Sequence, residues 1–153
     1  MITPLDFPKA PLKLKRKNDQ LFVWCIIRKI ELVLTPEEWV RQHTIHYLID
    51  VKKIPIGLIA SEFPISYNSR QKRADIVVFN REQKPILIVE CKAPEVPLSQ
   101  ATMLQIAQYN SELDVPYLFL TNGLKHIVCQ IDELSKKISL LDELPDAHAI
   151  GLK

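Results

Sequence analysis

The sequence predicts an α/β domain built on a mixed β-sheet that is flanked by helices. Two apolar segments, Arg73 to Phe79 and Ile86 to Cys91, are separated by a polar turn and are typical of two adjacent strands. Helix-start signals precede this pair near Thr35 and follow it near Ser99, and further apolar segments come after the second helix. Strands joined first by turns and then by a crossover helix indicate both antiparallel and parallel neighbours.

Length and charge indicate one domain with a basic extension. The chain has 153 residues, 47% of them apolar, which is enough for one substantial core. We therefore expect a basic N-terminal arm over residues 1–20 and a single domain over residues 21–153. The net charge of +2 does not by itself indicate a nucleic-acid partner. The arm either contacts phosphates or is a solvated tail, and its basic side chains are Lys9, Lys13, Lys15, Arg16 and Lys17.

Cysteine usage and hydropathy predict a cytoplasmic protein that does not contact a membrane. Cys25, Cys91 and Cys129 lie far apart in apolar runs without a CxxC pair, which is typical of buried thiols in a reducing compartment. No segment reaches the roughly 18 to 20 apolar residues of a membrane span. The early run Leu21 to Ile27 is too short for a signal-peptide core.

The first helix has a clear start. Residues 1–20 show no sustained periodicity and predict irregular structure, whereas Leu21 to Ile27 and Lys29 to Leu34 predict strands or extended chain. Thr35 then fits an N-cap, Pro36 the first helical position, and Glu38 the last position of a capping box. With Pro55 and Gly57 as terminators, this helix is expected over residues 36–52.

The remaining elements follow from turn signals. A polar turn is expected over residues 67–72 and another over residues 80–84, and Thr121-Asn122-Gly123 predicts a hairpin turn. Ser99 is the expected N-cap of a second helix that reaches about Leu113. The expected strands besides the central pair are Leu58 to Ser66, Tyr117 to Leu120 and Lys125 to Ile131.

Charged residues interrupt the two central apolar strands, and these residues are the candidates for a chemical role. Side chains alternate along a strand, so Glu90 and Lys92 point to one face and Cys91 to the other, while pairing with the preceding strand brings Asp75 close to Glu90. Charges in such an apolar setting are costly unless they are paired or bind a metal. A structural Glu90–Lys92 ion pair and a metal site both fit. Oxygen ligands without histidine favour Mg²⁺ or Mn²⁺ over zinc.

These residues carry a family resemblance. Asp75, Glu90 and Lys92, in the order helix, three strands, helix, strand, resemble the PD-(D/E)xK nuclease superfamily, whose fold is the restriction-endonuclease-like core, αβββαβ, here with an extra β-strand. The segments Leu34 to His43, Arg73 to Asp75 and Val89 to Pro94 further resemble the N-terminal nuclease domain of type I restriction enzyme R (HsdR) subunits, in a small stand-alone form. The resemblance covers about residues 21–131.

The resemblance implies Mg²⁺-dependent hydrolysis of DNA phosphodiesters. It assigns metal binding to Asp75 and Glu90, a catalytic role to Lys92, and an additional ligand to the carbonyl of Cys91. Glu38 resembles a first-helix glutamate that joins the metal site in related nucleases, and it fits the capping box equally well.

Three further residues are candidates for substrate binding. Gln105 and Tyr109 resemble a QxxxY motif, and their spacing of four places them on one helical face. They either reach DNA or pack against each other. Arg73 lies two residues before Asp75, where it holds that acid, contacts a phosphate or forms an ordinary surface ion pair.

The sequence differs from the R subunits in one respect. It contains no GxxxxGK[ST] phosphate loop, so we expect substrate recognition by the chain alone, by a homodimer or through a partner protein. Two alternatives remain open at this point. One is a non-catalytic DNA-binding module that uses the basic arm, and the other is an assembly subunit in which Trp39 and Tyr47 contact a partner.

Overall fold

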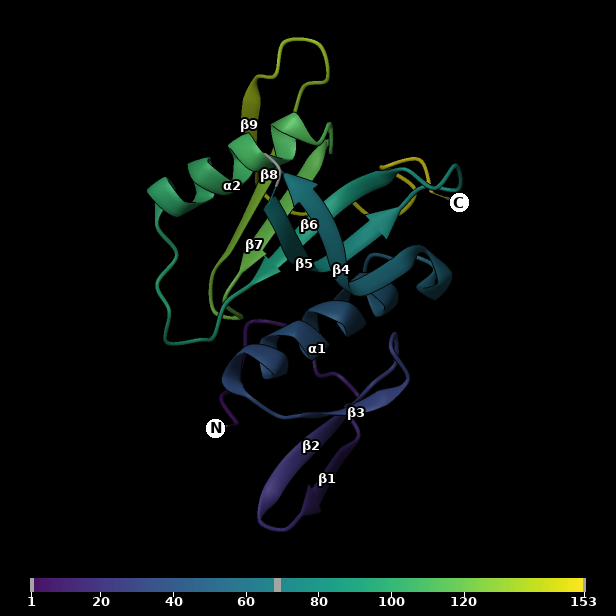
Figure 1. The fold of residues 1–153 in the computed structure, drawn as a ribbon, viewed down its shortest axis with the longest axis vertical. Coiled ribbons are helices and arrows are strands. Elements are labelled where there is room, and N and C mark those ends of the chain that lie inside the picture. The colour runs from purple at the N-terminus through teal and green to yellow at the C-terminus, as the bar shows by residue number, and fades with distance from the viewer. Residues whose placement is uncertain (1, 68–69, 153) are drawn as a thin grey trace.

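The chain forms two β-sheets with a helix between them (Figure 1). The computed structural model describes residues 2–67 and 70–152, without the side chains of Tyr67, Arg70, Gln108, Tyr109, Ser111 and Glu112. The smaller sheet contains β1 (Leu14–Lys17), β2 (Gln20–Cys25) and β3 (Ile30–Val33). The larger sheet contains β4 (Ile59–Tyr67), β5 (Arg70–Phe79), β6 (Pro85–Cys91), β7 (Tyr117–Thr121), β8 (His126–Ile131) and β9 (Ile138–Leu141). The helices are α1 (Pro36–Asp50), the short 3-10 helix η1 (Ile56–Leu58) and α2 (Gln100–Glu112).

The larger sheet is mixed, as the sequence predicts. Its spatial order is β4-β5-β6-β7-β8-β9, so sequence neighbours are also neighbours in space. Strands β6 and β7 are parallel, whereas the other neighbours in this sheet are antiparallel. A parallel pair needs a crossover connection, and α2 provides it. This arrangement confirms the predicted α/β class and the hairpin at residues 121–123.

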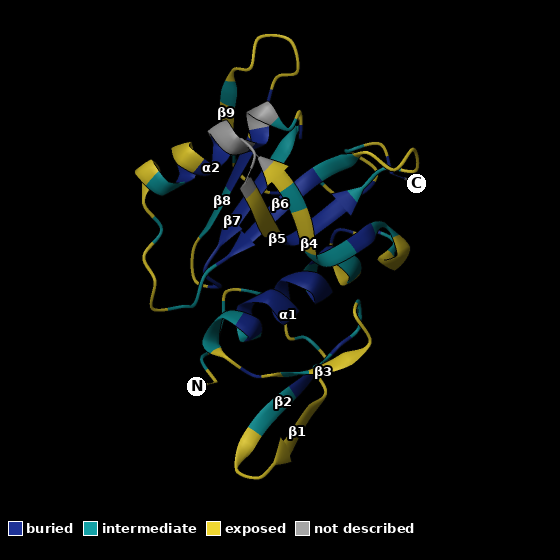
Figure 2. Cartoon of the chain, viewed as in Figure 1, coloured by how far each residue is buried: buried dark blue, intermediate teal, exposed yellow. Residues whose placement is uncertain are grey.

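The helices cover opposite faces of the larger sheet. Phe119 packs in the cluster that contains the apolar residues of α1, whereas its neighbours Leu118 and Leu120 pack with Met103 and Ile106 of α2. Because successive side chains of a strand point to opposite faces, α1 and α2 lie on different sides of the sheet. Helix α1 is also covered by the smaller sheet, so most of its length is buried in Figure 2.

Both helices begin at the expected caps. The Thr35 hydroxyl accepts a hydrogen bond from the backbone N–H of Glu38 at 3.0 Å, and Pro36 occupies the first turn. The Ser99 hydroxyl accepts from the backbone N–H of Thr102 at 3.1 Å. The helix expected over residues 36–52 ends at Asp50, so its start was predicted more accurately than its end.

The prediction of irregular structure throughout residues 1–20 is wrong. Residues Leu14–Lys17 form β1, which pairs antiparallel with β2 although all four side chains are exposed. Such a strand has no buried face, and therefore no apolar alternation by which sequence can identify it. The preceding segment is also held, because Thr3 O accepts from Trp39 Nε1 at 2.8 Å and Asp6 N donates to Gly123 O at 2.7 Å.

Strand β9 is a further element that the sequence did not predict. It pairs antiparallel with β8 at the edge of the larger sheet. Within the described ranges, none of the helices combines the length and apolar character that crossing a bilayer demands.

Candidate active site

The candidate site lies where β5 and β6 stop pairing with each other. The last register pair at this end joins Ile76 to Val89, and Asp75 and Glu90 are the next residues on the two strands. The backbone N–H of Cys91 donates to Asp75 Oδ2 at 2.7 Å, so the Asp75 carboxylate is fixed against the end of β6. The sequence prediction that pairing brings Asp75 close to Glu90 agrees with this register.

Cys91 and Glu90 lie on opposite faces of β6 at the site. Its buried thiol lies 3.9 Å from Thr44 Oγ1 on the α1 side of the sheet, and burial raises the pKa of the thiol. Glu90 instead lies near Lys72 of β5, with Glu90 Oε1 and Lys72 Nζ 3.8 Å apart. The predicted alternation of Glu90 and Cys91 is therefore present. A buried thiol with a raised pKa is a poor nucleophile, which leaves the backbone carbonyl as the group that Cys91 can offer.

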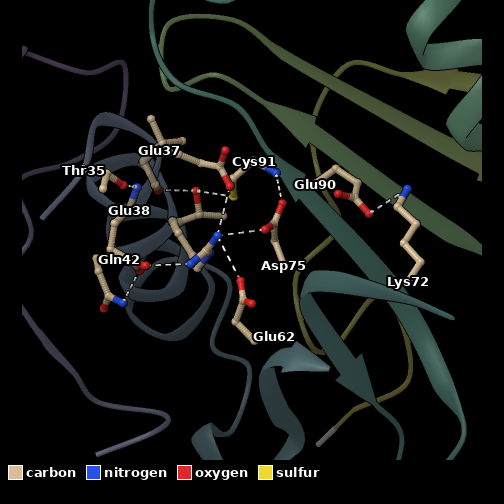
Figure 3. Close-up of polar contacts among 12 residues, drawn as sticks. Thr35, Glu37, Glu38, Gln42, Glu62, Lys72, Asp75, Glu90 and Cys91 are labelled. Carbon is tan, nitrogen blue, oxygen red and sulfur yellow. Dashed lines mark hydrogen bonds and ion pairs between the residues drawn. The ribbon is translucent and has the colours of Figure 1, made fainter. Parts of the chain in front are cut away.

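Arg41 of α1 gathers the acidic groups of the site. Its Nη2 lies 2.9 Å from Asp75 Oδ1, 3.0 Å from Glu37 Oε1 and 3.1 Å from Glu62 Oε1, and its Nη1 lies 2.6 Å from Glu38 Oε1. These carboxylates converge from helix and strands in Figure 3. Only 9% of the Arg41 side chain is exposed. The pairs with Glu38 and Asp75, whose side chains are 8% and 12% exposed, are therefore shielded from water and interact more strongly than surface pairs do, whereas Glu37 and Glu62 are partly exposed.

Glu38 belongs to this cluster rather than to a closed capping box. Its Oε1 accepts from Arg41, and its Oε2 accepts from Gln42 Nε2 at 2.9 Å. The Thr35 hydroxyl caps the helix by itself. The Glu38 carboxylate thus lies in the Arg41 cluster, and its role in metal binding stays a prediction.

Glu62 reaches the cluster through an unusual backbone conformation. It lies between the β4–β5 register pairs Ser61–Ile76 and Phe63–Ala74, opposite Asp75. Its φ of 56° is in the left-handed region, which non-glycine residues seldom adopt. This conformation accompanies the 3.1 Å contact between Glu62 Oε1 and Arg41 Nη2.

Glu90 is buried without full compensation. Its exposed fraction is 6%, and its Oε1 has no hydrogen-bond partner in the described part of the chain. Burial and the neighbouring Asp75 charge raise the pKa of Glu90 to about 8, although Lys72 and Lys92 oppose the rise. Glu90 therefore carries a proton near neutral pH unless another cation stabilises the carboxylate.

The donor groups fit a hard divalent cation. Asp75 and Glu90 offer adjacent carboxylate oxygens, and the buried Glu90 Oε1, which is paired with Lys72 at 3.8 Å, accepts no hydrogen bond and could therefore ligate a cation. Asp75 Oδ1 is engaged by Arg41, so an ion would share or take over this oxygen. No group of three or more His, Cys, Asp or Glu side chains in the described ranges is already arranged as a ligand set.

Lys92 follows β6 directly. Its backbone N–H donates to Thr121 O at 2.8 Å, which continues the alignment of β6 with β7 past Cys91. In the described ranges the ion pair of Glu90 is with Lys72 rather than with Lys92, so the structural pair that the sequence allowed is not formed.

The predicted substrate-binding residues are less closely connected to the cluster. Gln105 is exposed on α2, and the Tyr109 side chain lies outside the described residues. Arg73 is exposed on β5 opposite Pro64, and the ion-pair partner of Asp75 is Arg41 instead.

Three residues at the site were not predicted from the sequence: Arg41, Glu62 and Lys72. Arg41 follows Glu37 by four residues and Glu38 by three, which is the spacing of helical ion pairs and was a usable signal. The contacts of Arg41 with Glu62 and Asp75 join distant segments, which spacing alone does not reveal.

Comparisons with known proteins give one family match and two similar solved structures. A family model described as "Type I restriction enzyme R protein N terminus (HSDR_N)" matches residues 36–145. None of the curated proteins compared matches the chain. A fragment of a proposed HsdR subunit of a type I restriction enzyme from Vibrio vulnificus YJ016 is 26% identical, with a TM-score of 0.42, over 60% of this chain and 19% of the other. The chain thus spans less than a fifth of the length of that fragment.

A second solved structure is more distant in sequence. It is a proposed nuclease of the DUF820 group from Anabaena variabilis ATCC 29413, with 12% identity and a TM-score of 0.48 over 90% of this chain and 80% of the other. The family match covers most of the chain and includes α1, the central strands and α2. The chain therefore belongs to the family of type I restriction enzyme R protein N-terminal domains, and its α/β core is restriction-endonuclease-like.

Proposed function

We propose that this protein is a Mg²⁺-dependent DNA endonuclease that hydrolyses phosphodiester bonds. The observation that carries the proposal is the pair of adjacent carboxylates, Asp75 and Glu90, at the point where β5 and β6 separate, with Lys92 immediately beyond β6. Buried like charges are costly unless a cation compensates them, and the raised pKa of Glu90 expresses that cost.

The proposed roles follow from the contacts of each side chain. Asp75, Glu90 and the carbonyl of Cys91 would hold Mg²⁺ or Mn²⁺, and a bound ion would polarise a phosphoryl oxygen and supply an activated water. Glu90, whose pKa is raised, would hold such an ion in its deprotonated form. Arg41 keeps Asp75 oriented through its 2.9 Å contact, and Lys92 stabilises negative charge that develops on the phosphate.

Glu38 has a supporting role in this proposal. It is held by Arg41 and Gln42 and lies in the same cluster as Asp75, so it contributes negative charge near the ion without a direct contact being required. Arg73, Gln105 and Tyr109 are proposed to contact the DNA backbone or a base. The proposed protein acts with a partner protein or as a homodimer, in the cytoplasm, and its membership of a restriction-enzyme subunit family supports a role beside a partner.

The proposal is tested by incubating the purified protein with linear, nicked, branched and single-stranded DNA in Mg²⁺ or Mn²⁺. Asp75→Ala and Lys92→Ala are compared with Lys84→Ala, a matched control at an exposed lysine in the turn before β6. We expect cleavage by the wild type and the control, and loss of cleavage in the first two variants. Equal cleavage by all preparations would contradict the proposal.

A second candidate function is a non-catalytic DNA-binding module. It is favoured by one observation, that Arg41 already occupies Asp75 Oδ1 and so competes with a metal ion for this oxygen. This candidate predicts DNA binding in the absence of Mg²⁺, and no cleavage of any of the four substrates when Mg²⁺ or Mn²⁺ is added.

A further inference from the structure

We propose that the solvent-facing side of the smaller sheet binds single-stranded DNA. The surface consists of Lys13, Lys15, Lys17, Phe22 and Trp24, which we call the basic face. In this proposal the lysines bind phosphates, and the aromatic rings stack on a base. The inference rests on the proposed function in taking DNA as the partner, and it deepens that function by locating a surface that holds a strand.

The smaller sheet has two chemically different sides. Val23 and Cys25 of β2 are fully buried on the side toward α1. Phe22 and Trp24 alternate with them and point to the opposite side, where both rings stay partly exposed. The sheet therefore uses one face for the core and leaves an aromatic face to solvent. Its outermost strand β1 is entirely exposed in Figure 2.

The lysines lie beside these rings. Lys15 is directly opposite Phe22 in the β1–β2 register, and Lys13 O accepts a hydrogen bond from the backbone N–H of Trp24 at 3.0 Å. Lys17 Nζ lies 5.6 Å from the centre of the Phe22 ring. Alternate residues of a strand are separated by about 6.6 Å. The three lysines thus form a row of positive charge along one edge of the aromatic pair.

A hollow lies between these groups. Its volume is about 270 Å³, and it is lined by Lys13, Leu14, Lys15, Phe22, Trp24 and Glu31. A row of cations beside an aromatic hollow matches a strand whose bases are accessible, because phosphates and the flat face of a base can be engaged together. Paired bases in a duplex do not offer that face.

Glu31 provides an internal competitor for the phosphates. Its carboxylate lies 3.1 Å from Lys17 Nζ and 4.0 Å from Lys15 Nζ, and the Lys15 and Lys17 side chains are 61% and 49% exposed. Exposed ion pairs of this kind are weak and screened by salt, so a phosphate can replace Glu31. Removal of this charge should strengthen binding, which a purely structural role of the lysines would not produce.

The basic face is also close in sequence to the candidate site. Strand β3 ends at Val33, and Thr35 caps the helix that carries Glu38 and Arg41. The smaller sheet extends beyond α1 on the side away from the larger sheet (Figure 1). DNA bound to the basic face would therefore contact a sheet that a short connection joins to α1, the first helix of the candidate site.

Binding is measured by fluorescence anisotropy with a fluorescein-labelled oligothymidine and with a duplex of the same length, in EDTA so that cleavage does not contribute. We expect the single strand to bind at least about tenfold more tightly than the duplex, since only accessible bases stack. Replacing Lys13, Lys15 and Lys17 together by glutamine should reduce the slope of log affinity against log salt by about 2. A Glu31→Gln variant should bind more tightly than wild type.

The matched control replaces three exposed lysines outside the basic face, Lys53, Lys84 and Lys125, by glutamine, which changes the net charge equally. It should bind like the wild type. In a Trp39→Phe background, the oligothymidine should quench the fluorescence of Trp24, whereas Trp24→Leu should weaken binding without unfolding the sheet. Circular dichroism checks that each variant is folded.

Two outcomes would overturn the inference: equal binding by the two triple variants, or a duplex that binds as tightly as the single strand. Cleavage in Mg²⁺ is scored separately. Metal-dependent cleavage without binding in EDTA would overturn this inference and leave the proposed function standing. Binding in EDTA without cleavage in Mg²⁺ would overturn the proposed function and leave this inference standing.

Discussion

Replacement of Arg41 by methionine tests whether the buried cluster depends on its central cation. Methionine keeps much of the side-chain volume and removes the charge. The change would leave Glu38 and Asp75, whose side chains are only 8% and 12% exposed, without the guanidinium that contacts both. Burial alone would lower the pKa of Arg41, but Glu38, Asp75 and Glu62 together raise it, so the residue is charged in the folded wild type.

The expected loss of stability is large. Removing one partner of a buried ion pair costs about 3–5 kcal/mol, because the remaining charge is left uncompensated. Arg41 contacts two buried carboxylates and the partly exposed Glu37 and Glu62, so we expect a value within this range.

The assay is urea unfolding followed by circular dichroism, in EDTA. The matched control is Arg73→Met at an exposed arginine of β5, which should change the free energy of unfolding by no more than about 0.5 kcal/mol. A double-mutant cycle that combines Arg41→Met with Asp75→Asn should give a coupling energy of about 1–3 kcal/mol. A loss below about 1 kcal/mol for Arg41→Met, or a loss no larger than that of Arg73→Met, would show that the cluster does not depend on this cation.

Three further predictions concern single residues. The pKa of Glu90 rises from 4.5 to about 8 on folding, so between these pH values the folded state binds more protons than the unfolded state. The free energy of unfolding of the wild type in EDTA should therefore fall as pH rises from 4.5 to about 8, and Glu90→Gln should remove this contribution. Parallel pH profiles of the wild type and the variant would contradict this prediction. Thr35→Ala should lower the free energy of unfolding by about 1 kcal/mol, measured in urea, because it removes the N-cap of α1. Gly123→Ala should lower the melting temperature, because φ is 86° and the added Cβ would lie 2.6 Å from Leu5 Cδ2. An unchanged melting temperature would contradict this prediction, because the backbone strain remains even if Leu5 moves aside.

Much of the fold was predictable because its main elements have local signals. The caps at Thr35 and Ser99, the apolar central strands and the turn at residues 121–123 each carry a pattern within a few residues. Strands β1 and β9 have mostly exposed side chains, so their pairing depends on neighbours that sequence periodicity does not identify.

The candidate site was predictable in part for the same reason. Asp75 and Glu90 are conspicuous because they interrupt apolar strands, and strand pairing fixes their proximity. Arg41 contacts Asp75, which lies more than thirty positions away in sequence, because α1 packs on the sheet. Glu62 depends on a left-handed backbone at one position, which its residue type does not predict.

Isothermal titration calorimetry with Mg²⁺ tests the claim that Asp75 and Glu90 together form a metal site. We predict one Mg²⁺ per chain at about pH 7, with an enthalpy that depends on the buffer, because Glu90 with its raised pKa must release a proton when the ion binds. Asp75→Asn and Glu90→Gln should each abolish this binding, whereas Lys92→Ala should retain it. Absence of binding by the wild type, or equal binding by all the variants, would contradict the claim.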